Sequence, residues 1–211
     1  HAVSCHSYEH LHARRVHSLV LALYNAINTQ RVLSVNYKPY NEECVSLTFH
    51  PQFLKEFNGR WFLFGHVEDA PSKYPEDACN LAIDRIVEKP REIDNKLYVG
   101  ANAGYYSDFF KNIIGVTHTE DKKVYVIHVR AHDIKIFKLT ETKPIHTSQK
   151  TIVPFGEHDD GVYGEFAVKI EVNNEFISQI LRMGAGLEIV SPDEVRDIFK
   201  QRVENLSKLY K

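Results

Sequence analysis

The residues best suited to binding chemistry lie in one stretch, residues 60–66, with the sequence Arg-Trp-Phe-Leu-Phe-Gly-His. Its aromatic and apolar content is typical of a β-strand, in which side chains alternate between two faces. Trp61, Leu63 and Gly65 would share one face. The other face would be basic and aromatic, with Arg60, Phe62, Phe64 and His66. A small barrel buries only one face of a strand, so the second must be covered by a helix, another domain or a ligand.

A second apolar stretch, residues 81–86, contains two neighbouring residues of opposite charge, Asp84 and Arg85. If this stretch is a strand, the two side chains point to opposite faces of it. From spacing alone, we interpret both residues as members of structural ion pairs at the end of a strand.

The polar segment at residues 144–150 brings the His146 imidazole close to two hydroxyl groups and an amine. Acid–base or nucleophilic catalysis requires a partner acid or base within hydrogen-bonding reach, and the sequence identifies none. A hydrogen-bonded surface or interdomain loop is therefore the favoured interpretation. The sequence also lacks a Walker A loop and a G-x-S-x-G elbow, so it predicts no enzyme.

The chain has twelve histidines and three cysteines, but their spacing predicts no metal centre. His6 and His10 would share a helix face, which is compatible with a metal ion, yet no H-E-x-x-H pattern accompanies them. We interpret them as solvated histidines near a chain terminus. Cys5, Cys44 and Cys79 include no C-x-x-C, which favours reduced structural thiols. No cofactor is predicted.

The composition is that of an ordinary soluble globular protein, with 43% hydrophobic and 26% charged residues in a chain of 211. The formal net charge of −2 excludes a strongly basic nucleic-acid-binding protein, so any basic site must be local. No apolar run approaches the ~18 residues needed to span a bilayer, and no signal peptide opens the sequence. These features predict a cytoplasmic protein with two domains.

The elements that must position these residues begin with an amphipathic helix at about residues 9–28. Its apolar residues recur at spacings of three and four, which gives one buried stripe. The stripe consists of Val16, Leu19, Val20, Leu23 and Ile27. Arg14, Arg15 and His17 fall outside the stripe, so we expect the outer side of the helix to be wet and basic.

Five short strands are expected next, at residues 33–37, 45–50, 53–57, 60–67 and 81–86. Pro51 should close the second strand, because proline cannot donate a hydrogen bond to the ladder. Asn58-Gly59 should form a two-residue hairpin turn with both residues at positive φ. Five short strands in so few residues favour a small, strongly bent barrel.

The last part of the chain is predicted to be an α+β layer with helices on one face of a small sheet. Strands are expected at residues 124–130, 166–172 and 187–190. One helix should be capped by Asn173 or Asn174 and end at Gly184 or Gly186. A final helix should begin at a capping box formed by residues 191–194. Its expected buried stripe is Val195, Ile198, Phe199, Leu206 and Leu209.

The predicted fold class is therefore α+β, in four segments. Residues 1–30 form a helix or connector, and residues 31–92 form the barrel. Residues 93–118 form a connector with one short helix, and residues 119–211 form the C-terminal domain.

These features together resemble one known family. Residues 60–63 resemble the tryptophan-tyrosine-leucine signature of the WYL domain, and residues 81–86 resemble the family's Leu-Asp-Arg-Ile ending. Other matching positions, in the order of the family, are Ala26-Ile27, Tyr37, His50-Pro51 and Asn58-Gly59-Arg60. From about residue 122 to 192 the chain resembles the C-terminal extension that often follows this domain.

The resemblance implies an Sm-like or SH3-like barrel that senses a ligand in bacterial transcriptional regulators, commonly as a homodimer, followed by a ferredoxin-like α/β layer. The implied ligand is a nucleotide or single-stranded nucleic acid held by basic and aromatic side chains. The residues that match such a site are Arg60 and Arg85 for phosphate, Phe62, Phe64 or Tyr37 for a base, and His66 beside them. Phe62 stands where the family has tyrosine, so stacking alone remains possible there.

Regulators of this family usually carry a winged helix-turn-helix ahead of the barrel, for which this sequence has no room. Operator DNA would be bound only through that missing segment, and the start at His1 without methionine favours a fragment over a stand-alone sensor. The leading hypothesis is a non-enzymatic, ligand-sensing module of a transcriptional regulator. The alternative is a protein-interaction or dimerisation module with no small ligand.

Overall fold

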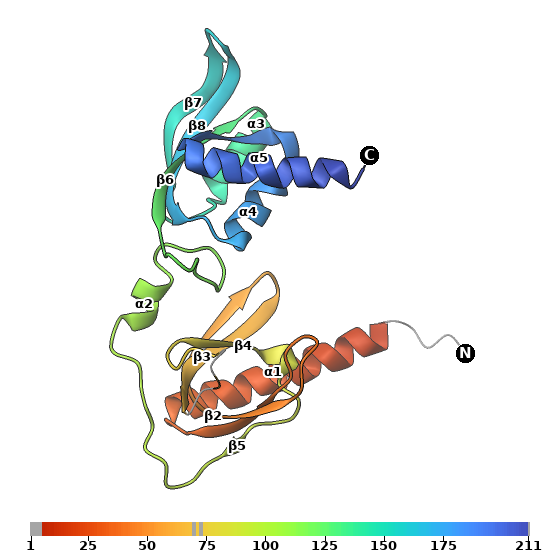
Figure 1. Ribbon diagram of the computed structural model, residues 1–211, viewed down its shortest axis with the longest axis vertical. Coiled ribbons are helices and arrows are strands. Elements are labelled where there is room, and N and C mark those ends of the chain that lie inside the picture. Colours follow the sequence, from red (N-terminus) through yellow and green to blue (C-terminus); the bar gives the residue numbers. More distant parts are fainter. Residues whose placement is uncertain (1–5, 69–70, 72–73, 211) are drawn as a thin grey trace, which may run out of the picture. The chain divides into compact units, whose positions relative to one another are not determined.

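The structure is a computed structural model that describes residues 6–68, 71 and 74–210, with side chains from residue 14 onward. The chain divides into two compact units, residues 1–106 and 107–211, each with its own sheet (Figure 1). The predicted division into four segments stays a prediction. Within the described residues, no helix is both long and apolar enough to cross a membrane.

The N-terminal unit packs one long helix, α1 (His6–Asn28), against a five-stranded antiparallel sheet (Figure 1). The strands lie in the order β4-β3-β2-β1-β5 across the sheet. Their bounds are β1 (Leu33–Tyr37), β2 (Val45–Phe57), β3 (Arg60–Glu68), β4 (Cys79–Ala82) and β5 (Arg91–Glu92). The predicted amphipathic helix is confirmed, because Leu19, Leu23 and Ala26 of α1 are buried.

The core of this unit lies between α1 and one face of the sheet. Leu23 of α1, Val35 of β1, Phe49 of β2 and Leu63 of β3 are fully buried together. Burying a side chain of this size contributes roughly 1.5–3 kcal/mol. The face of β3 that carries Leu63 and Val67 therefore holds the unit together.

β2 is one continuous strand, so the prediction that Pro51 closes a strand is wrong. Pro51 pairs with Gly65 of β3, and the register shifts between Pro51 and Phe53. Such an irregularity interrupts the regular hydrogen-bond ladder, and a proline is tolerated there. The predicted hairpin turn is confirmed, because Asn58 and Gly59 have φ angles of 51° and 74°.

The stretch at residues 81–86 is only partly a strand. β4 ends at Ala82, and Ile83–Arg85 form a 3₁₀ turn, η1. Beyond this turn, Ile86 forms an isolated antiparallel bridge with Tyr37 of β1. The sheet is therefore strongly curved, since the chain that leaves β4 at one edge meets a strand three places away. The described strands nevertheless form an open sheet, so the α+β class is confirmed and the closed barrel is not.

The C-terminal unit contains a four-stranded antiparallel sheet in the order β7-β8-β6-β9. Its strands are β6 (Val124–Ala131), β7 (Lys150–His158), β8 (Gly161–Glu171) and β9 (Leu187–Ser191). Its helices are α3 (Ile134–Thr142), α4 (Asn174–Leu181) and α5 (Asp193–Lys208), and the short α2 (Tyr105–Phe109) lies at the boundary of the two units. Ile127, Phe166 and Val168 are buried on one sheet face, whereas Val126 and Lys169 of the other face are exposed.

The sequence predicted a cap at the start of each of the last two helices, and one of these predictions is confirmed while the other is wrong. Asn173 caps α4, as predicted, by accepting a hydrogen bond of 2.9 Å from the Phe176 amide. The capping box at residues 191–194 is wrong, because Pro192 occupies the N-cap position and offers no side-chain acceptor. The Glu194 carboxylate accepts hydrogen bonds from Lys123 and Tyr125 instead.

The expected stripe of α5 is also only partly buried. Val195 and Phe199 are buried, but Leu206 and Leu209 are 50% and 80% exposed. The far end of the helix therefore has an apolar side that its own unit does not cover.

We expect Gly65→Ala to destabilise the N-terminal unit by about 1–3 kcal/mol or more, the usual cost of overpacking a core. An added Cβ would meet the His50 carbonyl oxygen and lie 2.5 Å from the Phe49 ring, and the backbone oxygen cannot move aside cheaply. Urea unfolding monitored by circular dichroism measures the change. Gly100→Ala is the matched control, because its Cβ would make only an ordinary 3.5 Å contact; equal effects of the two substitutions would contradict the packing argument.

Candidate functional site

Arg60, at the start of β3, is held by Asp84 of the η1 turn through a two-point ion pair. Arg60 Nε donates to Asp84 Oδ1 and Arg60 Nη2 donates to Asp84 Oδ2, both at 2.8 Å. Burial raises the pKa of Asp84, but the hydrogen bonds and charge of Arg60 outweigh it and lower the pKa overall. The ion-pair interpretation of Asp84 therefore fits, with a partner from another element, and the fork orients the Arg60 guanidinium.

Arg85 forms a different contact. Its guanidinium carbon lies 3.4 Å from the centroid of the Tyr40 ring, in a close cation–π stack. Its Nε is buried and has no hydrogen-bond partner among the described residues. The Arg85 side chain is thus positioned by an aromatic face and keeps unused donor capacity, in contrast to Arg60.

The turn that carries Arg85 is anchored on two sides. The backbone oxygen of Arg85 accepts a hydrogen bond of 3.1 Å from the Lys38 amide. Arg15 of α1 donates to the carbonyl oxygens of Ile86 and Val87 at 2.5 and 2.6 Å. Arg15 was expected to be part of a merely wet helix face, and the structure gives it a specific role in holding this turn.

Tyr40 brings the two predicted arginines together. It lies between β1 and β2 and is 69% exposed. Hydrogen bonding and charge from Arg85, and to a smaller extent from Arg60, lower the pKa of the Tyr40 phenol. We name Tyr40, Arg60, Phe62, Asp84 and Arg85 the Tyr40 cluster. Its two guanidinium groups and one carboxylate leave an excess of positive charge. The sequence pattern alone did not single out Tyr40, although a large aromatic residue within a polar turn was a signal.

The other predicted site residues divide between surface and interior. Phe62 is half-buried, and its ring lies 5.7 Å from the Arg60 guanidinium carbon, which places it in the cluster. Tyr37 is buried in the core and Phe64 is fully buried against Tyr106. Neither ring offers an exposed face on which a base could stack, so their role in ligand binding stays a prediction. His66 faces Asp77, with 2.9 Å between Nδ1 and Oδ1, away from the arginines.

The outer face of β2 and β3 is covered by the chain itself. We call residues 96–106 the strap. Tyr98 donates to the Pro51 carbonyl at 2.5 Å, and Tyr106 donates to Gln52 at 2.8 Å. The Tyr106 ring also stacks on Phe53 at a centroid distance of 4.8 Å. From the sequence, we expected a helix, a domain or a ligand to cover this face. In the structure, the strap covers it instead.

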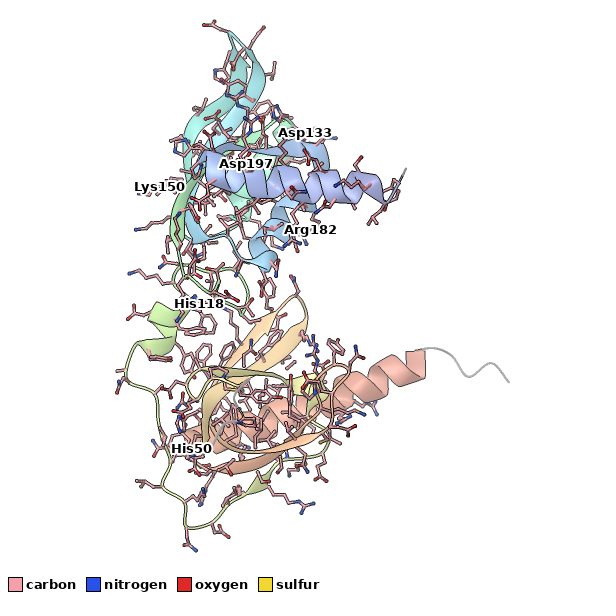
Figure 2. The ribbon with its side chains drawn as sticks, in the orientation of Figure 1. His50, His118, Asp133, Lys150, Arg182 and Asp197 are labelled. Carbon is pink, nitrogen blue, oxygen red and sulfur yellow. The ribbon has the colours of Figure 1, made fainter. Side chains whose placement is uncertain are left out.

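His50 fastens the strap from inside the unit (Figure 2). Its Nδ1 accepts a hydrogen bond of 2.9 Å from the Val99 amide, so the ring proton lies on Nε2. Nε2 then donates to Glu68 at 2.9 Å, and Lys96 forms an ion pair with the same carboxylate. Burial is the main reason that the pKa of His50 lies below its usual value. His50 is therefore neutral, and both of its nitrogens are engaged.

Two protein-family models match this sequence. A WYL domain model matches residues 18–88, and a WCX domain model matches residues 119–207.

The chain contains a WYL domain followed by a WCX domain.

The WCX match covers most of the second unit, and the strap falls between the two matched segments. The WYL match supports a regulatory, ligand-sensing module in general. No curated protein matches this sequence.

Two solved structures are similar to the WYL protein over most of its length. The first is the proteasome accessory factor B/C (PafBC) of Arthrobacter aurescens, at 13% identity and a TM-score of 0.36; the match covers 88% of this chain and 26% of that one. The second is a CRISPR Cas-related protein, at 10% identity and a TM-score of 0.49, with 92% and 52% covered. This chain thus spans about a quarter and about half of those two chains, and at such scores neither supports an assignment of ligand or partner.

The WYL signature lies where the fold and the candidate site meet. Leu63 is fully buried and Trp61 packs against the core from a half-buried position. Phe62, between them in sequence, is half-buried and lies 5.7 Å from the Arg60 guanidinium carbon. The position that departs from the family's tyrosine is therefore at the site and not in the core.

Other groups considered from the sequence are structural or lie outside the described residues. The Ser148 hydroxyl lies 2.8 Å from His146 Nδ1 and donates to the Lys169 carbonyl at 3.0 Å, so this segment is a hydrogen-bonded loop, as favoured. Burial raises the pKa of the Cys79 thiol to about 12, which makes it unreactive. In the part of the chain that the structure describes, no three His, Cys, Asp or Glu residues could hold a metal ion. The side chains of Cys5, His6 and His10 lie outside that part.

The neutral state of His50 predicts a pH dependence of stability. Because its folded-state pKa lies below the usual 6.5, the unfolded chain binds a proton at higher pH than the folded one. The stabilisation is complete above pH 6.5 and is lost as the pH falls through the folded pKa.

Urea unfolding between pH 8 and pH 5 measures this loss, and we expect it to be smaller in His50→Asn, which keeps an acceptor near Nδ1 but does not titrate. His17→Asn, an exposed position on α1, is the control and should behave like the wild type. Identical pH profiles of the wild type and His50→Asn would contradict this role.

Proposed function

We propose that the WYL unit binds a nucleotide or a short single-stranded nucleic acid at the Tyr40 cluster, as the cytoplasmic sensing module of a transcriptional regulator. The observation that carries the proposal is the Arg85 guanidinium, which is stacked on Tyr40 and has a buried, unsatisfied Nε beside a second arginine. A buried donor without a partner is costly, so an acceptor brought by a ligand would be favoured.

Arginine suits this role because its planar guanidinium binds phosphate through two parallel hydrogen bonds. Arg60 already uses its Nε–H and one Nη2–H for Asp84, which leaves three N–H donors, two of them on Nη1. Arg85 has more donors left and would make the main contact. Phe62, half-buried beside Arg60, offers an aromatic edge or face to a base.

The finer fold assignments also belong to the proposal. The curved sheet of the WYL unit supports an Sm-like class, although its strands do not close. In the WCX unit, the order strand, helix, strand, strand, helix, strand from β6 to β9 and the sheet order β7-β8-β6-β9 support a ferredoxin-like layer.

We expect Arg85→Ala to weaken binding of a fluorescein-labelled oligodeoxythymidine by at least tenfold. The substitution removes a charge-assisted phosphate contact worth about 1.5–3 kcal/mol. It leaves the backbone of the turn, which is held by Lys38 and Arg15, in place. Fluorescence anisotropy measures binding, and thermal unfolding checks that the fold is kept.

Arg91→Ala is the matched control, because it removes an equal charge from a side chain that is 78% exposed. Arg91 forms a surface ion pair with Glu88, with 3.5 Å between Nη2 and Oε1. It should change binding far less. The slope of log affinity against log salt should also fall by about 0.7–1 in Arg85→Ala, as expected for one lost phosphate contact. Unchanged affinity and slope in Arg85→Ala would remove this site.

Self-association is the second candidate function, and the uncovered end of α5 favours it. Val203, Leu206, Leu209 and Tyr210 are each at least half exposed and follow helical spacing. They adjoin a groove of about 640 Å³ between α4, β9 and α5, whose apolar lining includes Ile180, Leu187, Ile189 and Phe199. The exposed apolar residues and the groove both lie along α5. This arrangement suits a two-fold dimer, in which each copy places its exposed apolar residues in the groove of the other.

Leu206→Lys tests this second candidate. A charge in the middle of the stripe should convert a dimer to a monomer, as measured by sedimentation velocity. Leu97→Lys changes another apolar side chain, 90% exposed in the WYL unit, and should leave the dimer intact. A dimer that persists in Leu206→Lys would exclude this surface.

A further inference from the structure

Tyr40 is an unusual residue to find at a ligand-binding surface, because it already contacts the arginine side chains that a ligand would bind. Its ring covers the face of the Arg85 guanidinium at 3.4 Å. Its phenol oxygen lies in the field of both Arg85 and Arg60, which lower its pKa. At the same time the residue is 69% exposed, so it is not part of the core.

The chemistry of Tyr40 corresponds to that of the proposed ligand class. A nucleotide carries a flat aromatic base and, a short distance away, an anionic oxygen. Tyr40 carries a flat aromatic ring and a weakly acidic oxygen. The base would take the place of the ring on Arg85, and the phosphate would take the place of the phenol between Arg85 and Arg60.

We propose that Tyr40 is an internal substitute for the ligand, and that a ligand carrying both an aromatic ring and a phosphate binds by displacing it. This inference rests on the proposed function, and it adds the internal competitor that sets the affinity for a nucleotide. A phosphate without a ring, or a base without a phosphate, would replace only half of what Tyr40 provides.

The two sides of the contact are held with very different strength. The turn that carries Arg85 is anchored to α1 by Arg15, and Arg60 is fixed by the fork to Asp84. Tyr40 sits between two strands, in the loop of residues 38–44, and the neighbouring Asn41 has a left-handed φ of 55° that is typical of a tight turn. Displacement of Tyr40 therefore leaves the arginines where they are. It costs the exposed cation–π contact and the interactions of the phenol with Arg85 and Arg60, which a phosphate would replace.

Isothermal titration calorimetry of Tyr40→Ala and Tyr40→Phe tests the competition. Removing a competitor raises the population of the binding-competent state, so Tyr40→Ala should bind adenosine monophosphate about two- to fivefold more tightly than the wild type. Tyr40→Phe keeps the stack and loses the phenol, so it should lie between them. Tyr24→Ala, which removes an exposed tyrosine from α1, should bind like the wild type.

Four probes define the ligand class. Adenosine monophosphate should bind the wild type more tightly than adenosine or inorganic phosphate does. A short oligodeoxythymidine and the mononucleotide share the required chemistry, and their relative affinities show which source the site prefers. Equal affinity for inorganic phosphate and adenosine monophosphate would overturn the requirement for a ring.

Nuclear magnetic resonance of the Tyr40 ring gives an independent readout. Its proton resonances should move toward those of a free tyrosine when adenosine monophosphate is added. Unchanged or weaker binding in Tyr40→Ala, or a Tyr40 ring that stays on Arg85 in the complex, would overturn displacement and make Tyr40 a contact residue instead.

The failure of this inference can be distinguished from failure of the proposed function. If Arg85→Ala weakens binding and Tyr40→Ala does not strengthen it, only displacement is wrong. If no probe binds the wild type or Tyr40→Ala, the proposed site and the inference both fail.

Discussion

The N-terminal unit depends on how the two faces of β3 are covered. One helix can bury only one face of a sheet, and α1 does this for Leu63 and Val67. The strap covers Phe64 on the opposite face through Tyr106, and His50 fastens it. These contacts lie toward the Glu68 end of β3. Arg60 and Phe62, at the hairpin end, remain half-buried, and this incomplete cover is what creates a surface able to meet a ligand.

The two arginines of this surface differ in how their charge is compensated. Asp84 compensates Arg60 and orients it, whereas Arg85 is placed by an aromatic ring and keeps unused donors. An ion pair alone would be a structural feature of modest value, because partly exposed pairs contribute little. Arg85 stacks on an exposed tyrosine, and among the described residues its buried Nε has no hydrogen-bond partner. These two features are harder to explain by stability, since an exposed cation–π contact is weak. The anion site that we propose would account for both features.

Local signals in the sequence predicted local structure well. Asn58-Gly59 formed the expected turn and Asn173 the expected cap, because both depend on neighbours within a few residues. Prediction failed where tertiary partners override local preference: Pro51 lies inside β2 because a bulge accommodates it, and Glu194 bonds to Lys123 and not to a cap. β7 was missed because register shifts break the two-residue period on which strand prediction relies. α3 was missed although the Asp133 side chain caps it with two amide hydrogen bonds.

By itself, the sequence determined the α+β class, the WYL signature and the two arginines, since these follow from residue type, spacing and order along the chain. Only the tertiary structure decided which partner each arginine has, because Asp84 and Tyr40 reach them from distant elements. It also decided that Phe64 and Tyr37 are interior and that Tyr40 is at the surface. The two-residue period of a strand assigns a side chain to one of its faces. Whether that face is covered depends on the strap, because long-range hydrogen bonds and ring packing set the position of the strap.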